Sequence, residues 1–97
     1  MSGKQGRRRS FVDDQGVIWT ERGGTLSASE LARMVRNPEI IVCHDYLGNL
    51  RPIPVDERLS FWADAESRMR ESTFSEFYGQ EYKSEDRRHL VVITEYC

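Results

Sequence analysis

Residues 39–55 read EIIVCHDYLGNLRPIPV and contain the pattern that decides the fold of this chain. A β-branched apolar run at 40–42 is followed by the turn sequence YLGN at 46–49 and by a second short run with two prolines. This pattern predicts a β-hairpin whose first arm is buried on both faces, because β-branched residues favour buried strands and a glycine favours a tight turn. Pro52 and Pro54 cannot donate ladder hydrogen bonds, so we expect the second arm at an edge of the sheet.

The segment before this hairpin predicts a smaller hairpin and one helix. Short apolar runs at 11–12 and 17–20 flank the sequence DDQG, which is typical of a hairpin with a three- to four-residue loop. The sequence S-x-x-E at 27–30 has the form of a capping box and precedes apolar residues at helical spacing. The helix is expected to end near Asn37, because Pro38 disfavours the helical conformation in the residue before it.

Two further helices and a final strand are expected after the central hairpin. Asp56 is a suitable N-cap for a helix that runs to about residue 71. A second capping-box sequence at 73–76 predicts a third helix with an aromatic face. The apolar run at 90–93 predicts a strand inside the sheet, beside the run at 40–42. The aromatic face of the third helix would consist of Phe74, Phe77, Tyr78 and Tyr82.

These elements define an α+β fold in the order ββαββααβ. We expect a mostly antiparallel five-stranded sheet packed with three helices, because that arrangement buries every apolar stripe. The chain has 97 residues, of which 31% are charged and 10% aromatic, which fits a single small domain. No apolar run approaches the roughly 20 residues that cross a bilayer, and no apolar segment follows the basic N-terminus, so we expect a cytoplasmic protein.

Charge is unevenly distributed along the chain. The net charge is −2, and the first ten residues contribute four positive charges and no acid, so subtracting that +4 leaves −6 for residues 11–97. We expect residues 1–9 to form a flexible basic arm and residues 10–97 to form the α+β domain. Arginine outnumbers lysine twelve to two, which is typical of a GC-rich bacterial or bacteriophage genome. The basic residues of the arm are Lys4, Arg7, Arg8 and Arg9.

Candidate catalytic groups are few. Cys43 precedes a histidine and an aspartate, but neighbouring residues of a strand point to opposite faces, so a reactive Cys43 would need a base from elsewhere, such as His89. The alternative is that Cys43 is a small hydrophobic residue of the core. Glu66 falls within the apolar stripe of the second helix. It is either a partly desolvated carboxylate with a raised pKa or the partner of Arg70, or of an arginine from another element, in an ion pair at the edge of the core.

Metal and cofactor sites are not predicted. No pair of ligand-type residues has the spacing of a zinc site, and no glycine-rich phosphate-binding motif is present. The residues that could be assembled into a zinc site without such spacing are Cys43, His44, Asp45, His89, Glu95 and Cys97.

The surface residues point to binding. A core of this size already holds two tryptophans and two phenylalanines, so it has little room for the other aromatic side chains. Exposed aromatic residues with arginine nearby have the composition of a protein–protein interface. We therefore predict these contact residues: Tyr46, Arg51, Phe61, Tyr78 and Tyr82.

Together these features predict a small non-enzymatic protein-binding module, of the regulator or inhibitor type that bacteria and bacteriophages encode. A homodimer is a variant of this prediction, because an unpaired strand edge can form a symmetric interface. One alternative is a nucleic-acid-binding accessory protein that uses its basic arm, although the acidic body disfavours phosphate contacts. A second alternative is a small hydrolase or transferase that uses Cys43 or Glu66 with His89.

Overall fold

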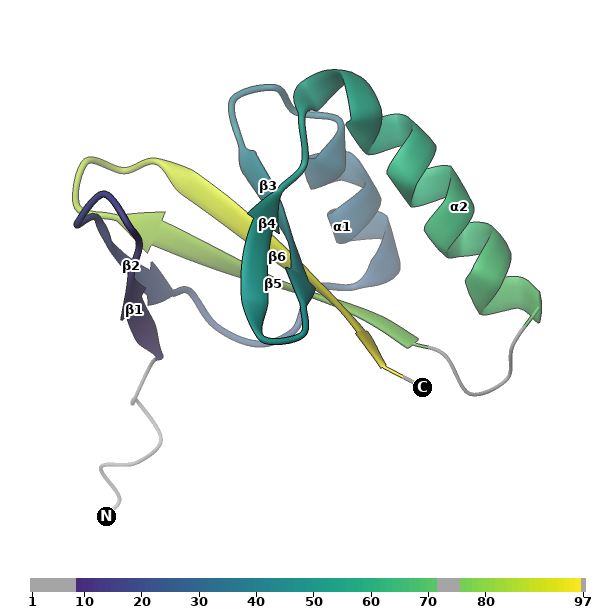
Figure 1. The fold of residues 1–97 in the computed structure, drawn as a ribbon, viewed down its shortest axis with the longest axis horizontal. Helices are drawn as coiled ribbons and strands as arrows, with labels where there is room; N and C mark the ends of the chain where they lie inside the picture. The colour runs from purple at the N-terminus through teal and green to yellow at the C-terminus, as the bar shows by residue number, and fades with distance from the viewer. Residues whose placement is uncertain (1–8, 72–75, 97) are drawn as a thin grey trace, which may run out of the picture.

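A six-stranded sheet in the order β1-β2-β5-β6-β3-β4 is the framework of the protein (Figure 1). The computed structural model describes residues 9–71 and 76–96. All neighbouring strands are antiparallel except β3 and β6, which run parallel. In chain order the elements are β1 (Ser10–Val12), β2 (Ile18–Glu21), α1 (Ala28–Val35), β3 (Ile41–Tyr46), β4 (Asn49–Pro52), a 3-10 turn (Val55–Glu57), α2 (Arg58–Glu71), β5 (Glu76–Ser84) and β6 (His89–Tyr96).

Both predicted hairpins and the first helix are confirmed. The β3–β4 hairpin turns through Leu47 and Gly48, whose φ angles of 53° and 79° are those of a tight two-residue turn. At the start of α1, the Ser27 side chain accepts a hydrogen bond from the Glu30 backbone, and the Glu30 carboxylate accepts one from the Ser27 backbone at 3.1 Å. The run at 40–42 and the run at 90–93 also lie side by side as predicted, with Val42 opposite Val91.

The predicted third helix is wrong. Residues from Glu76 onward form β5. Within residues 9–71 and 76–96 the sheet therefore has six strands instead of five, there are two α-helices instead of three, and the order is ββαββαββ. Residues 73–75 of the predicted capping box lie outside the described residues. Phe77 and Tyr82 fit a helical period, but the strand pairs with β6 from Glu76 to Lys83 and with β2 near its end, and this pairing decides its conformation.

The second helix is confirmed, with one difference at its start. Asp56 lies inside the 3-10 turn that leads into α2 and does not cap the helix with its side chain. The first residue of α2, Arg58, is instead buried, and its guanidinium Nη1 donates to the carbonyl oxygen of Asn37 at 2.8 Å. This hydrogen bond joins the start of α2 to the segment between α1 and β3.

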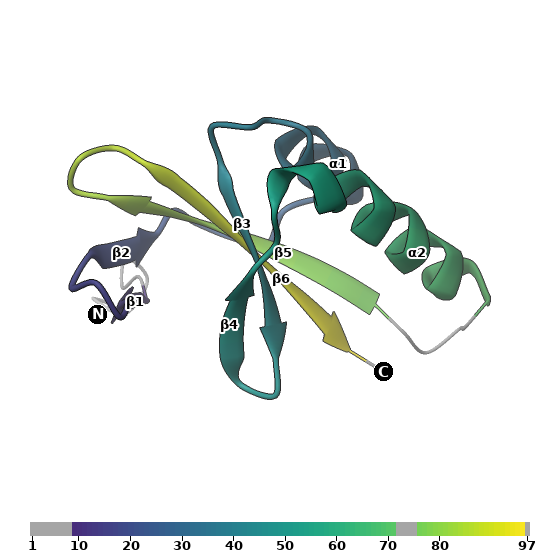
Figure 2. The same cartoon turned by 45° about the horizontal axis from the view of Figure 1, so that its top comes forward.

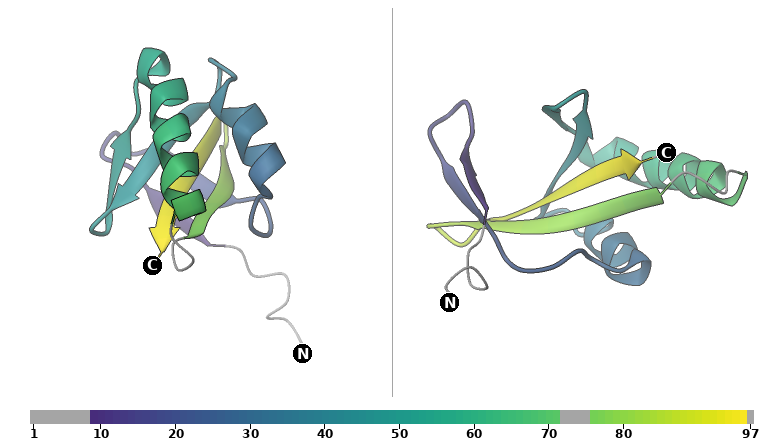
Figure 3. Two further views of the ribbon diagram at one scale, coloured as in Figure 1. Left: turned by 90° about the vertical axis from the view of Figure 1, so that its right-hand side faces the viewer. Right: turned by 90° about the horizontal axis from the view of Figure 1, so that it is seen from below.

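The two faces of the sheet differ. Both helices pack on one face, where Trp62 of α2 and Leu31 of α1 are buried against Val42, Val91 and other core residues. The sheet is strongly twisted, and the β3–β4 hairpin crosses β5 and β6 at a steep angle (Figure 2). On the other face, which we call the open face, the β1–β2 and β3–β4 hairpins rise on the same side of the sheet (Figure 3). The buried residues of the open face are Trp19, Cys43, Tyr82, Leu90 and Val92.

An Asp–Trp contact organises the β1–β2 hairpin. The Asp13 carboxylate accepts hydrogen bonds from the backbone N–H groups of Gln15 and Val17 at 2.9 Å and from the indole Nε1 of Trp19 at 3.0 Å. The bond from Trp19, followed by the bond from Val17, holds the pKa of Asp13 below its ordinary value. Trp19 itself is buried, so this carboxylate links the loop to the core of the open face.

The lowered pKa of Asp13 predicts a loss of stability in acid. The folded-state pKa of Asp13 lies below the unfolded value of about 3.9. The stabilisation that the ionised Asp13 carboxylate gives the folded state is therefore present above pH ~4, and it is lost as the pH falls through the folded-state pKa. The free energy of unfolding, measured by urea denaturation across this range, should therefore fall more steeply in the wild type than in Asp13→Asn. Identical pH profiles for the two proteins would contradict the assignment.

Gly79 lets α1 approach the sheet. A Cβ atom at this position would lie 2.6 Å from Cδ1 of Leu31 and 3.3 Å from Cδ1 of Leu26. Leu31 is only 1% exposed, so it has little room to move away. The absence of a side chain at Gly79 is therefore a packing requirement of the α1–β5 contact.

We expect Gly79→Ala to lower the free energy of unfolding by about 1–3 kcal/mol, the usual cost of overpacking a core. Gly24→Ala is the matched control, because a Cβ there meets no atom within 4 Å, and it should change stability by less than about 0.5 kcal/mol. Urea denaturation of both variants measures the difference. Equal stability of the two variants would show that α1 does not pack on β5 in this way.

Candidate functional site

The five predicted contact residues are divided between the two faces of the sheet. Three of them, Tyr46, Arg51 and Phe61, come together beside the β3–β4 hairpin on the face that carries the helices. Tyr78 and Tyr82 are in β5 and face the open side. The structure therefore contains two candidate surfaces instead of one.

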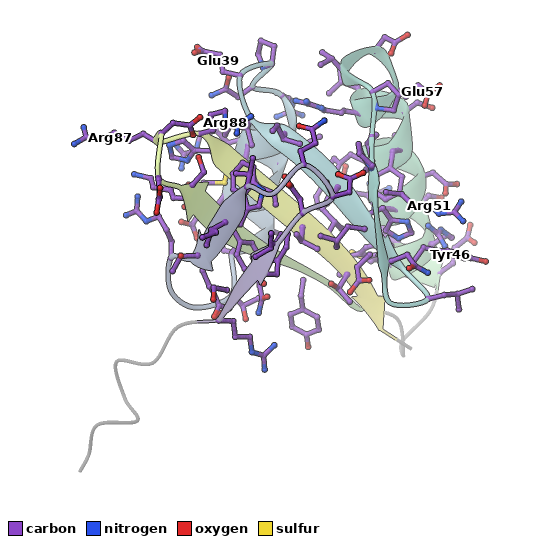
Figure 4. The ribbon with its side chains drawn as sticks, turned by 60° about the vertical axis from the view of Figure 1, so that its left-hand side comes forward. Glu39, Tyr46, Arg51, Glu57, Arg87 and Arg88 are labelled. Carbon is purple, nitrogen blue, oxygen red and sulfur yellow. The ribbon has the colours of Figure 1, made fainter. Side chains whose placement is uncertain are left out.

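The first surface is a cluster of four side chains, which we call the edge cluster. The guanidinium of Arg51 lies over the ring of Tyr46, 5.3 Å from its centroid, and the two residues lie at the outer edge of the hairpin (Figure 4). The His44 ring makes edge-to-face contacts with Phe61, at a centroid distance of 5.1 Å, and with Tyr46, at 6.1 Å. Tyr46 is 45% exposed and Arg51 is exposed, whereas His44 and Phe61 are half-buried. The half-buried rings thus support an exposed Tyr–Arg pair.

His44 was not predicted as a contact residue, although the sequence contains a signal for it. His44 and Tyr46 are two positions apart in β3 and therefore point to the same face, and Arg51 is directly opposite His44 in the hairpin. A two-residue turn fixes this register, so the three side chains could have been placed together from the sequence. Only the contact with Phe61, 17 positions along the chain, needed the structure.

Strand β4 supplies a free backbone edge next to the edge cluster. It is the last strand in the sheet order, as Pro52 and Pro54 predict, and all four of its residues are exposed. Because β4 pairs only with β3, the backbone groups on its outer side are not used by the sheet. Pro52 has no N–H group, which limits how far a further strand can pair along this edge.

The second surface is on the open face, and there the expectation that the Tyr82 ring is exposed is wrong. Tyr82 is only 8% exposed, because the Phe11 ring packs edge-on against it at a centroid distance of 5.1 Å. Its hydroxyl donates to Oε1 of Gln80 at 3.2 Å, and burial raises its pKa. Tyr78 is half-buried and lines the same hollow, whose volume is about 530 Å³.

The candidate catalytic residues are not brought together. Cys43 is buried among the side chains of the open face, and burial raises the pKa of its thiol to about 11. His89 lies on the helix-covered face, where its Nδ1 is 2.5 Å from a carboxylate oxygen of Glu81. The sheet separates the two groups, so His89 cannot take the proton of Cys43. Glu66 is half-buried on α2, and no hydrogen bond or ion pair joins it to either group among the described residues.

The metal, membrane and nucleic-acid predictions involve residues that the structure describes only in part. Within residues 9–71 and 76–96, no three His, Cys, Asp or Glu side chains converge as metal ligands. No described helix is both long and apolar enough to span a bilayer. Lys4, Arg7 and Arg8 lie outside the described residues, whereas the exposed Arg9 accepts a backbone hydrogen bond from Glu21 and lines the open-face hollow. Nucleic-acid binding by the arm stays a prediction.

No protein-family model matches this chain, and comparisons with curated proteins and with solved structures give no significant match. No ligand or activity is therefore transferred to its residues from a relative. The two surfaces described above carry the functional argument.

The buried thiol gives a direct test of the catalytic alternative. With a pKa of about 11, Cys43 is protonated at pH 8, and its side chain is 5% exposed. In a Cys97→Ser background, iodoacetamide should therefore label the native protein at pH 8 at least about a hundredfold more slowly than the urea-unfolded chain, as followed by mass spectrometry. Equal rates in the two states would show a reactive thiol and support the hydrolase or transferase alternative.

Proposed function

We propose that this protein is a binding module that recognises another protein through the edge cluster and the adjacent free edge of β4. The observation that carries the proposal is the exposed stack of Arg51 on Tyr46 at an unpaired strand. Tyrosine and arginine are enriched among the residues that contribute most to protein–protein binding. The stack is also held in place by the His44 and Phe61 rings behind it, which reduces the entropy lost on binding.

The free edge of β4 supports the same proposal. An extended segment of a partner can add to an exposed strand through main-chain hydrogen bonds, and nearby side chains then give specificity. Here the edge cluster would supply those side chains. The same edge could pair with a second copy of this chain, which is the homodimer variant of the proposal.

Catalysis is not part of the proposal. The sheet lies between Cys43 and His89, so the proposal does not use them as a cysteine–histidine pair. No hydrogen bond or ion pair joins Glu66 to either residue among the described ones. The proposal keeps the wider expectation of a regulator or inhibitor encoded by a bacterium or a bacteriophage, because a small domain with an exposed recognition surface suits that role.

Affinity capture from cells of the source organism, followed by mass spectrometry, tests the proposal. The wild-type protein should recover a partner in stoichiometric amount. The double variant Tyr46→Ala/Arg51→Ala should reduce the recovery of this partner tenfold or more, because each alanine change at such a residue weakens the binding free energy by about 1–2 kcal/mol. The matched control is the double variant Ile18→Ala/Arg22→Ala. It truncates an exposed apolar side chain in β2 and an exposed arginine directly after this strand.

Recovery of no protein at all would contradict the proposal, and so would a partner captured equally well by both double variants. Thermal denaturation of the variants checks that each remains folded. Sedimentation velocity of the wild type shows whether the captured partner is a second copy of the chain.

A further inference from the structure

The outer edge of β4 has a backbone pattern that a second copy of the same strand matches. The two-residue turn of the β3–β4 hairpin puts Asn49 in its first hydrogen-bonded pair, so every second residue from Asn49 onward directs its N–H and C=O toward β3. The 2.8 Å hydrogen bond from the Ile53 N–H to the Val42 carbonyl follows the same alternation. The backbone groups of Leu50 and Pro52 therefore point to the free side of β4.

This free edge is complementary to itself. Because Pro52 has no N–H, Leu50 carries the N–H that β4 presents on this side. When two copies of a strand pair antiparallel about a two-fold axis, the residue on the axis lies opposite itself. With Leu50 on the axis, its N–H donates to the carbonyl oxygen of Leu50 in the second copy, and the second copy returns the same hydrogen bond. The pairing needs no N–H from Pro52.

The side chains favour this register over its neighbours. Centring the pair on Arg51 would put two arginines directly opposite each other, and like charges in such positions destabilise a strand pair. Centring it on Asn49 would put Leu50 opposite Gly48, which has no side chain to bury. With Leu50 at the centre, two leucines meet on the open face. On the other face, beside the edge cluster, Arg51 lies opposite Asn49 of the second copy, whose amide oxygen accepts hydrogen bonds.

Apolar side chains are exposed around the same edge. Leu47 at the tip of the hairpin is 86% exposed, and Val55 beyond the other end of β4 is 55% exposed. Antiparallel pairing about Leu50 brings the tip of each hairpin to the end of β4 in the other copy, so Leu47 of one copy approaches Ile53 and Val55 of the other. Of the seven large apolar side chains that the described chain exposes, five lie around β4, and such a group marks a surface that another chain covers. These five are Tyr46, Leu47, Leu50, Val55 and Leu59.

We propose that two copies of this chain pair through β4 about a two-fold axis at Leu50 and join their six-stranded sheets into one continuous sheet. Pro52 ends the ladder, so the dimer is held by a short pairing and by the apolar side chains around it. A small interface of this kind should have a dissociation constant of roughly 1–100 µM. The inference rests on the proposed function, because it names the second copy as the partner of the β4 edge.

Sedimentation velocity of the full chain tests the dimer. The wild type should change from monomer to dimer between roughly 1 and 500 µM. Leu50→Lys should weaken association about tenfold or more, because it places two like charges opposite each other on the axis. The matched control is Val12→Lys, which makes the same kind of change at a 62% exposed residue of β1, the strand at the other edge of the sheet, and should leave the dissociation constant unchanged. Thermal denaturation shows that each variant is folded.

An NMR measurement on the wild type gives the register without any variant. In a mixture of ¹³C-labelled and unlabelled protein, isotope-filtered NOESY detects only contacts between copies. Asn49 and Arg51 of the two copies form a non-hydrogen-bonded pair, in which the two backbones approach most closely. An Hα–Hα contact between these two residues is therefore expected. Within one strand the same Hα atoms are about 7 Å apart.

Four results would overturn the inference. A wild type that stays monomeric at the highest concentration is one, and a dimer that Leu50→Lys leaves intact is another. Loss of the dimer in Val12→Lys would mean head-to-tail pairing of β4 with β1 of the next copy. An Hα–Hα contact between the Arg51 residues of two copies would mean the register centred on that residue.

Failure of the dimer is distinguishable from failure of the proposed function. A monomeric chain that still captures a protein through Tyr46 and Arg51 would reject the dimer and keep the function. A dimer with the expected contacts that captures no protein besides its own copy would keep the inference and restrict the function to self-association.

Discussion

The parallel pairing of β3 with β6 is the constraint on which the rest of the structure depends. Val42 and Val91 lie opposite each other, and both are almost completely buried. Cys43 and Val92, the next pair, are buried on the other face. These two strands thus contribute buried apolar side chains to both faces of the sheet. Because parallel strands cannot be joined by a tight turn, the chain between them must cross over, and this crossover contains β4, α2 and β5.

The crossover explains why the two faces differ. Helix α2 covers one face together with α1, and the buried Arg58 links the chain after α1 to the start of α2. The other face has no helix over it in the described chain, so it is closed only in part, by Phe11 from β1 and by the rise of the two hairpins. A sheet that curls without closing leaves a groove on its concave side. The open face and the exposed edge of β4 are therefore consequences of one topology.

The predictions from sequence succeeded where the signal was local. The capping box at Ser27 and Glu30 and the turn at Leu47 and Gly48 depend on neighbouring residues, and both are present as predicted. Strand β5 was missed because Phe77, Tyr78 and Tyr82 fit either period, and only the pairing with β6 decides between them. The edge cluster follows largely from cross-strand register. The burial of Tyr82 depends on Phe11, more than 70 positions earlier in the chain, which no local pattern indicates.

Interstrand nuclear Overhauser effects between β3 and β6 test the central claim most directly. In a ¹³C,¹⁵N-labelled sample, NOESY spectra should show the backbone contacts of parallel strands, with Val42 beside Val91 and His44 beside Ile93. The same spectra should show antiparallel contacts between β6 and β5 on its other side. A β6 strand that pairs antiparallel with β3, or no contact between the two strands, would contradict the topology and the two surfaces derived from it.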